Sequence, residues 1–345
     1  MIVFVIAGGS GTRLWPLSTH EFPKHLLKLT NENSLLQNTI QRVEAVTSKD
    51  KIFVISDDSH VKHVREQLSH LEDDHILAEP GRRGTASCIA WALSVVEKKG
   101  FSEDEPIFFL WADHLIRSSE GFAATAYKAG ELAESQSKIV FIGVEPSYPS
   151  TGLGYIKKEK QLDDWYDVYH FGTFVEKPDH KTAQKYFESG NYLWNTGYLV
   201  GNLSTFKRHF NDEAPDMSDR FNVLSNAKNI KDAYLSLKSM AVEYVFSEKI
   251  KEALVVPGNF DWMDIGSFND LHDVSVQDDS GNHIHGSSVE LESTTNSYIR
   301  NETDVPVAVI GLDNVVVVNT ANGVLVTNKN YSQKVGDVAK RLQSK

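Results

Sequence analysis

Residues 8–13, Gly-Gly-Ser-Gly-Thr-Arg, join three glycines, two hydroxyl side chains and an arginine directly after the apolar run of residues 2–6. Successive backbone N–H groups of a glycine loop form a concave site for anions, and a guanidinium adds a fork of donors for phosphate oxygens. We therefore predict a phosphorylated ligand here, and a tight turn without a ligand is the alternative. The predicted binding residues are Ala7, Gly8, Gly9, Ser10, Gly11, Thr12 and Arg13.

Two common phosphate-loop patterns do not fit this segment. A Walker loop ends in Gly-Lys-[Ser/Thr], which does not follow here. A dinucleotide fingerprint counted from Gly9 needs glycine at position 14, which is Leu14. The loop therefore argues against a dinucleotide oxidoreductase, and the arginine two residues past Gly11 favours a phosphate ligand of another kind.

The elements around the loop alternate between strand and helix patterns. Apolar strands separated by amphipathic helices predict an α/β fold with a Rossmann-like, mostly parallel sheet and helices on both faces. Ligands of such sheets bind beyond the carboxyl ends of the strands, where the loop and residues 111–114 lie. The expected strands are 2–6, 51–56, 75–78, 106–111 and 138–144, and the expected helices are 34–46, 58–69, 85–98 and 121–133.

The composition changes near residue 280. From Gly281 onward the six basic and six acidic residues balance, so the net charge of −12 belongs to residues 1–280, which also hold all six tryptophans. Short β-branched runs follow at 305–310, 315–319 and 324–327, separated by Gly, Asn and Asp. We predict a large domain over 1–280 and a small β-rich module over 281–345, with a terminal helix at 332–342.

Overall composition limits the class of protein. The chain has 345 residues, 41% hydrophobic, with a net charge of −12, which argues against nucleic acid or an anionic membrane as a partner. The single cysteine, Cys88, excludes an internal disulfide and suits a reducing compartment. The apolar run at the N-terminus is too short for a signal peptide and lacks the basic flank of one. We expect a cytoplasmic protein.

Several segments together resemble one known family. Residues 8–18, GGSGTRLWPLS, followed by FPKHLL at 22–27, resemble the signature of the sugar-1-phosphate nucleotidyltransferases, and among them the mannose-1-phosphate guanylyltransferases. The β-rich tail is similar to the β-helix segment of that family. Further matching segments follow in the family's order over the first ~270 residues: Glu79-Pro80, Ala112-Asp113-His114, FVEKP at 174–178, WNTG at 194–197 and DWMDIGS at 261–267.

The resemblance implies transfer of a guanylyl group from GTP to α-D-mannose 1-phosphate, giving GDP-mannose and pyrophosphate. The attacking phosphate oxygen is already an anion at neutral pH, so the chemistry needs positioning and charge neutralisation rather than a general base. Two anions must approach each other, so cationic side chains and a divalent metal ion are expected. The residues with these catalytic roles are Arg13, Lys24, Asp113 and Asp264.

Asp113 and Asp264 are the expected metal ligands, because carboxylate oxygens suit Mg²⁺, with Mn²⁺ as a substitute. A helix cap or a turn is the alternative role for either aspartate. The family assigns Lys24 to the triphosphate, although a lone lysine is commonly a solvated surface residue.

Other matching residues would contact the sugar phosphate and the base. By resemblance, Lys177 holds the sugar phosphate, Glu176 and Asn195 contact sugar hydroxyls, and Gly154 lets the backbone approach the sugar. The alternatives are a Glu176–Lys177 charge pair and a buried turn asparagine. Glu79 would accept the two adjacent N–H donors of guanine, an edge that adenine lacks; a salt bridge to Arg82 or Arg83 is its alternative role.

The sequence departs from the family pattern at three positions. Leu153 replaces a tyrosine beside Gly154, Gly84 replaces an asparagine, and Trp111 replaces a proline before Ala112. The nearest alternative is the same reaction with another hexose 1-phosphate or nucleotide. From a different class, a nucleotide-sugar sensor without turnover would be expected to lack a metal aspartate or the loop arginine, and Arg13, Asp113 and Asp264 are all present. The valine-rich tail also has strand edges that need covering, so we expect a homodimer formed through that module.

Overall fold

The computed structural model describes residues 1–9 and 11–343 and divides into two compact units. The first unit comprises residues 1–7, 40–111 and 116–262, and the second comprises residues 8–39 and 112–115 together with the chain from 263 onward. Among the described residues, no helix combines the length and hydropathy that crossing a membrane requires.

The first unit contains a nine-stranded sheet in the order β3-β2-β1-β4-β9-β6-β10-β8-β7. Strands β8 and β9 run against the other seven, so the predicted mostly parallel, Rossmann-like sheet is confirmed. The strands are β1 (Ile2–Ala7), β2 (Ile52–Asp57), β3 (Ile76–Glu79), β4 (Pro106–Trp111), β6 (Ile139–Val144), β7 (Tyr155–Gln161), β8 (Tyr169–Val175), β9 (Tyr192–Asn202) and β10 (Ala253–Pro257).

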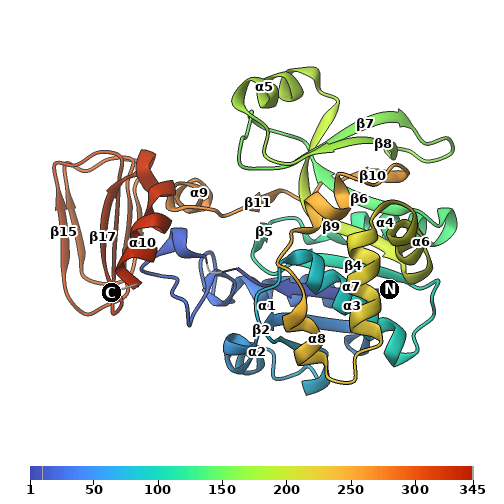
Figure 1. The fold of residues 1–345 in the computed structure, drawn as a ribbon. Helices are drawn as coiled ribbons and strands as arrows, with labels where there is room; N and C mark the ends of the chain where they lie inside the picture. The colour runs from blue at the N-terminus through green and yellow to red at the C-terminus, as the bar shows by residue number, and fades with distance from the viewer. Residues whose placement is uncertain (10, 344–345) are drawn as a thin grey trace. The chain divides into compact units, whose positions relative to one another are not determined.

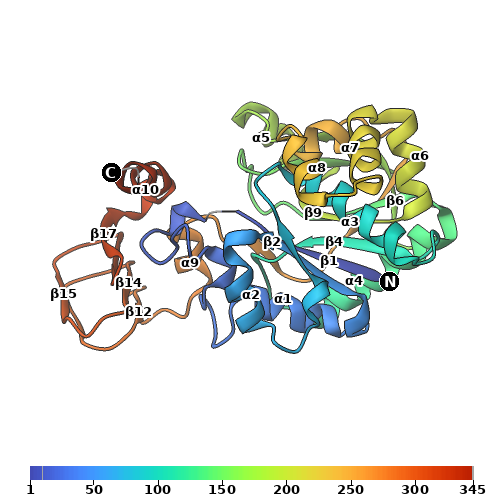
Figure 2. The same ribbon diagram turned by 60° about the horizontal axis from the view of Figure 1, so that its bottom comes forward.

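Helices cover both faces of this sheet, as Figure 2 shows. Phe4 stacks on Phe53 and Phe109 on the face that also packs α3, α6 and α7, and Phe108 packs against Phe122 of α4 on the other face. Burial on two faces explains why β1, β2 and β4 are continuous apolar runs rather than alternating ones. The helices are α1 (Leu35–Glu44), α2 (Val61–Gln67), α3 (Thr85–Lys99), α4 (Ser119–Gln136), α5 (His180–Ser189), α6 (Leu203–Glu213), α7 (Pro215–Ser225) and α8 (Ile230–Ser236).

The strand register brings the ends of the central strands together. Ile6 pairs with Trp111 and Asp57 pairs with Glu79 in parallel ladders. Strands β1 and β4 therefore end side by side, and the chain leaves them into residues 8–13 and 112–114. This is the edge at which sheets of this type bind ligands.

The C-terminal part of the second unit is built mainly from parallel strands that repeat along the chain, and its last strand is antiparallel to its neighbour. Ile284, Ile299 and Val317 stand opposite one another on successive parallel strands, so each turn of chain lies beside the last, as in a β-helix. The strands are β12 (His283–His285), β14 (Tyr298–Asn301), β16 (Val315–Thr320) and β17 (Gly323–Asn328) in one sheet and β13 (Val289–Glu292) with β15 (Val307–Ile310) in another. The predicted β-helix-like module is confirmed.

Two helices accompany this module, α9 (Phe268–Val274) and α10 (Val335–Gln343) (Figure 1). The predicted terminal helix starts three residues later than expected, because a 3₁₀ turn over Lys329–Lys334, capped by the side chain of Asn328, precedes it. Two short strands, β5 (His114–Ile116) and β11 (Trp262–Asp264), pair with each other.

The second unit has its own hydrophobic core, and the glycine loop shares it. Leu14 and Leu17, just after the loop, are buried in one cluster with Phe268, Tyr298 and Val316. A Cβ on Gly323 would lie 2.8 Å from the indole of Trp15, so the tail packs closely on this segment. The segment that carries the predicted phosphate site is therefore folded together with the β-helix module.

Candidate active site

The glycine loop has a backbone that requires glycine. Gly9 and Gly11 have φ angles of 94° and 56°, a region that residues with a side chain rarely adopt. A Cβ on Gly11 would lie 2.6 Å from the Cβ of Lys24, so only glycine allows this approach. The Ser18 hydroxyl donates to the Gly11 carbonyl and holds the turn. Ser10, another predicted ligand residue, lies outside the described residues.

Three charged side chains from distant parts of the chain meet beside this loop. The Lys24 ammonium lies 3.0 Å from Asp113 Oδ2 and 2.9 Å from Asp264 Oδ1. Only 7% of the Lys24 side chain is exposed, so this lysine is buried between the carboxylates rather than solvated. Asp113 follows β4, and Asp264 ends β11. Neither aspartate caps helix α9, because Ser267 does so.

The mutual attraction of these groups keeps them ionised although they are buried. Burial acts to lower the pKa of Lys24, but the two carboxylates raise it above its ordinary value. Burial likewise acts to raise the pKa values of Asp113 and Asp264, but the Lys24 ammonium lowers both below the ordinary value. All three groups are therefore charged at neutral pH.

The two carboxylates fit a divalent cation. One oxygen from each already lies about 3 Å from a single positive nitrogen, so Lys24 marks a position where both oxygens converge on positive charge. The Asp113 and Asp264 side chains are 30% and 33% exposed, which leaves them accessible from the adjoining cavity. Hard carboxylate oxygens are the donors that Mg²⁺ prefers.

A cavity of about 270 Å³ joins the loop to these carboxylates. The structure thus brings together all four residues predicted to be catalytic, Arg13, Lys24, Asp113 and Asp264. The lining consists of Gly9, Gly11, Thr12, Arg13, Leu14, Lys24, Asp113, Asp264, Ile265 and Gly266. Gly8 lies beside the lining residues at the end of β1, and Ala7 is the buried last residue of that strand.

The residues predicted to contact the sugar form a second group, in the first unit. A Cβ on Gly154 would lie 2.6 Å from Oε2 of Glu176, so glycine is needed for this carboxylate to approach. The Asn195 backbone N–H donates to the Gly154 carbonyl at 2.8 Å, and the Asn195 side chain accepts from the Gly197 amide at 3.0 Å. Gly154, Glu176 and Asn195 are therefore adjacent.

Lys177 extends this group outward. Its ammonium pairs with Glu176 at 3.1 Å, and 59% of its side chain is exposed while Glu176 is largely buried. The backbone of Lys177 has a φ of 44°, an uncommon conformation for a residue with a side chain. The charge pair considered as its alternative role is present, and the exposed ammonium is also accessible to a ligand.

Glu79 is buried at the end of β3. Its hydrogen-bond donors include a tyrosine hydroxyl and a backbone N–H rather than the side chains of Arg82 and Arg83. The Tyr234 hydroxyl donates to its Oε1 at 2.9 Å, and the Arg83 backbone N–H donates to the same oxygen at 3.3 Å. Arg82 pairs with Asp57 instead. Burial raises the pKa of Glu79 above its ordinary value, despite these donors.

Two of the three departures from the family pattern, Trp111 and Gly84, have structural explanations, and nothing in the structure explains Leu153. A Cβ on Gly197 would lie 2.0 Å from the indole nitrogen of Trp111, so the tryptophan packs directly on that glycine. A Cβ on Gly84, which has a φ of 77°, would lie 2.2 Å from the Met240 carbonyl, so this position now requires glycine. Trp111 and Gly84 thus each lie in close contact with the backbone of another segment.

Sequence reasoning missed four residues that contact or face these groups. Gln333 accepts a hydrogen bond from Arg13, and Gly336 lies against the Arg13 side chain. Tyr234 donates a hydrogen bond to Glu79. The charge of Glu243, in a π-helical turn (Glu243–Ser247), interacts with the charges of Glu176 and Lys177. Each lies far along the chain from its partner, so no local pattern could have identified it.

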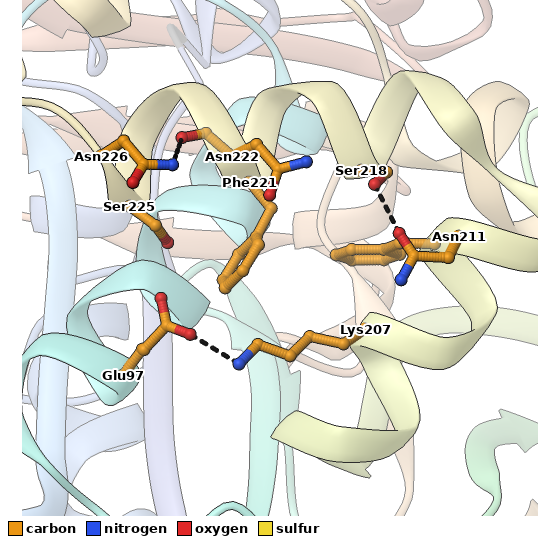
Figure 3. A pocket seen from close by; sticks show the side chains of 9 residues that line it. Glu97, Lys207, Asn211, Ser218, Phe221, Asn222, Ser225 and Asn226 are labelled. Atoms are coloured by element: carbon orange, nitrogen blue, oxygen red, sulfur yellow. Dashed lines mark hydrogen bonds and ion pairs between the residues drawn. The ribbon is translucent and has the colours of Figure 1, made fainter.

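The first unit contains a larger cavity, of about 370 Å³, between α3, α6 and α7 (Figure 3). Its polar groups largely hydrogen-bond one another. Lys207 pairs with Glu97, and Ser218 donates to Asn211 at 2.7 Å, as Figure 3 shows. Its lining holds one carboxylate, Glu97, rather than a pair that could hold a divalent cation, and it lacks a glycine loop.

Comparison with known proteins agrees with this geometry. The family model for nucleotidyl transferases matches residues 2–281, and the model for the mannose-phosphate isomerase/GMP-like β-helix domain matches residues 286–342. The chain is 34% identical over 356 residues to a mannose-1-phosphate guanylyltransferase of Escherichia coli, covering 99% of this chain and 75% of that one. It is 36% identical over 354 residues to the xanthan biosynthesis protein XanB of Xanthomonas campestris, covering 100% and 73%.

A solved structure is similar over the same extent. The crystal structure described as a mannose-1-phosphate geranyltransferase from Thermus thermophilus superposes with a TM-score of 0.89 and 28% identity, covering 99% of each chain. The similarity thus includes both the nucleotidyl transferase segment and the β-helix segment. The chain therefore belongs to the nucleotidyl transferase family, and its relatives over nearly its whole length include enzymes named mannose-1-phosphate guanylyltransferase.

Proposed function

We propose that this protein transfers a guanylyl group from GTP to α-D-mannose 1-phosphate, giving GDP-mannose and pyrophosphate. The observation that supports this most directly is the convergence of Arg13, Lys24, Asp113 and Asp264 on one cavity beside the glycine loop. A phosphate oxygen of the sugar attacks the α-phosphorus of GTP. The bond from that phosphorus to the bridging oxygen breaks, and pyrophosphate leaves with its electron pair.

The protein's own groups neutralise and position two anions. The backbone N–H groups of Gly9, Gly11 and Thr12 and the Arg13 guanidinium donate hydrogen bonds to triphosphate oxygens. Lys24, buried and fully charged, adds a fixed positive charge at the point where the carboxylates meet. Because the nucleophile is already ionised, fixed charges and correct placement supply the catalytic effect.

Nucleotidyl transferases generally use a divalent metal ion, and we propose Mg²⁺, with Mn²⁺ as a substitute. Asp113 and Asp264 would hold it. The chemistry that this ion supplies when bound is neutralisation of phosphate charge on both reactants.

Selectivity would come from the first unit. Glu176 and Asn195 contact sugar hydroxyls beside Gly154, and Lys177 reaches the sugar phosphate. Glu79 accepts the N1–H and exocyclic amine of guanine, which adenine cannot offer on that edge. Tyr234 orients the carboxylate for this role, because its hydroxyl donates to Oε1.

We further propose that the protein is a homodimer that pairs through the β-helix module. Strand β17 lies at the edge of its sheet, and Val324 and Val326 on that strand are 60% and 63% exposed. An exposed apolar edge strand is a surface that proteins cover.

Pyrophosphate release measured with each of four nucleoside triphosphates and several hexose 1-phosphates tests the reaction. We expect GTP with mannose 1-phosphate to give the highest kcat/KM by at least tenfold, and chelation of divalent ions to abolish release. A higher value for another pair would overturn the substrate assignment. Nucleotide binding without pyrophosphate release from any pair would instead identify a nucleotide-sugar sensor.

A further inference from the structure

We propose that Gln333, in the C-terminal module, is a positioning residue for the nucleotide site. It holds the guanidinium of Arg13 at the cavity that Lys24, Asp113 and Asp264 line. This inference rests on the proposed function, because it assumes that Arg13 receives triphosphate oxygens there.

The first observation is a direct contact across 320 residues of sequence. Arg13 Nη1 donates a hydrogen bond to Gln333 Oε1 at 3.0 Å. The Arg13 side chain is exposed, and an arginine without such a partner samples many rotamers. The contact therefore selects one orientation of a long, mobile side chain.

The second observation is a narrow path for Arg13 between two glycines. A Cβ on Gly336, in α10, would lie 3.0 Å from Cγ of Arg13, and a Cβ on Gly266 would lie 3.2 Å from its Nη1. The stem of the arginine thus lies against one backbone and its guanidinium against another. Gly266 also lines the cavity, so this path directs the guanidinium to the cavity wall.

Gln333 stands on a segment that is firmly anchored. The neighbouring Lys329 ammonium donates to Asn296 Oδ1 at 2.7 Å and lies 3.1 Å from His272 Nδ1. Ser332 is buried, and Val335 belongs to the core that Leu14 shares. The β-helix module therefore anchors the backbone that carries Gln333, whose side chain is itself exposed.

The chemistry of an amide suits this task. A guanidinium has five N–H donors, and Gln333 uses one of them, so the others are left for phosphate oxygens. A neutral amide orients the arginine without neutralising it. A carboxylate at the same place would compete with phosphate for the guanidinium.

The test compares Gln333→Ala and Gln333→Glu in the full-length protein, with Lys334→Ala as the matched control because that lysine is the exposed next residue. We expect Gln333→Ala to raise KM for GTP about 3- to 10-fold, and Gln333→Glu to raise it further. KM for mannose 1-phosphate and the melting temperature should stay unchanged in both variants. A larger loss for alanine than for glutamate would overturn the proposal.

A double-mutant cycle separates positioning from a general structural effect. Gln333→Ala should have no further effect on kcat/KM for GTP in an Arg13→Ala background. Multiplicative losses in the double variant, or a wild-type KM for Gln333→Ala, would overturn the role of Gln333. A wild-type protein that does not use GTP would instead overturn the proposed function, so the two failures are distinguishable.

Discussion

The ammonium of Lys24 lies 2.9 Å from Asp264, a residue 240 positions further along the chain. Asp113 lies 3.0 Å from the same ammonium. Two carboxylates at one site repel each other, and the buried lysine between them removes that repulsion. This ion cluster therefore keeps two acidic side chains together before any substrate binds.

Lys24→Met should reverse the pH dependence of stability at this site. In the wild type both carboxyl pKa values lie below their ordinary value of 3.8, so their contribution to stability is lost only as the pH falls below that value. Without the lysine, repulsion raises the pKa of at least one carboxyl, and the native state then binds more protons than the unfolded state. The variant should therefore gain stability as the pH falls from 7 to 5.

Thermal unfolding at pH 7, 6 and 5 measures this effect. The deficit of Lys24→Met relative to wild type should shrink with falling pH. Lys62→Met, at an exposed lysine of helix α2, should show no such trend. A deficit that is constant across this range would contradict the proposed electrostatic role of Lys24.

Asp113→Asn and Asp264→Asn should each abolish most of the transfer reaction. Asparagine keeps the shape but loses the charge that holds a divalent cation, so we expect kcat to fall at least 100-fold, about 2.7 kcal/mol in the barrier. Folding should persist, because Lys24 keeps one carboxylate partner in each variant. Asp261→Asn, at an exposed aspartate nearby, is the control. Near-normal turnover in either variant would refute the metal-binding role.

Glu79→Gln should weaken discrimination between nucleotides. A glutamine side chain has one acceptor oxygen and cannot take both guanine donors, so kcat/KM for GTP should fall at least tenfold while that for ATP changes little. Because burial raises the pKa of Glu79, the wild type gains stability from this group as the pH falls from neutral toward 4.5, and the variant should lack that gain. An unchanged ratio of GTP to ATP use would place base recognition elsewhere.

Val324→Lys together with Val326→Lys should convert the proposed dimer into a monomer. Both side chains lie on one face of edge strand β17 and are exposed, so two lysines add charge to the proposed interface without entering the core. Sedimentation velocity should show half the wild-type mass, whereas Val276→Lys, at a valine outside the module, should not change it. The same mass for wild type and double variant would count against this interface.

The sequence predicts five of the nine strands of the first unit, β1, β2, β3, β4 and β6, because most of their residues are apolar and buried. The run at 106–111 becomes β4 at the same residues, and the other four expected strands end within a residue of their expected limits. Strands β7, β8, β9 and β10 are not among the expected strands. Such strands carry an uninterrupted apolar signal that needs no knowledge of the rest of the chain. The α/β fold and the loop after β1 follow from that signal.

The remaining features depend on contacts between distant segments. A single lysine gives no local sign that it is buried, and Lys24 is recognisable only once both carboxylates are in place. Tyr234 stands 155 residues from Glu79, and Gln333 stands 320 residues from Arg13. Their roles depend on contacts between distant segments, which the periodicity of hydrophobic residues does not predict.

The common core of the glycine loop and the β-helix module has a consequence for exchanging parts between relatives. Leu14 and Leu17 pack with Phe268, Tyr298 and Val316, so a chimera that received only a foreign tail would combine two halves of unmatched cores. A transplant that carried residues 8–39 along with the tail would keep these partners together. The two segments lie far apart in the sequence, but we expect that they must be exchanged together.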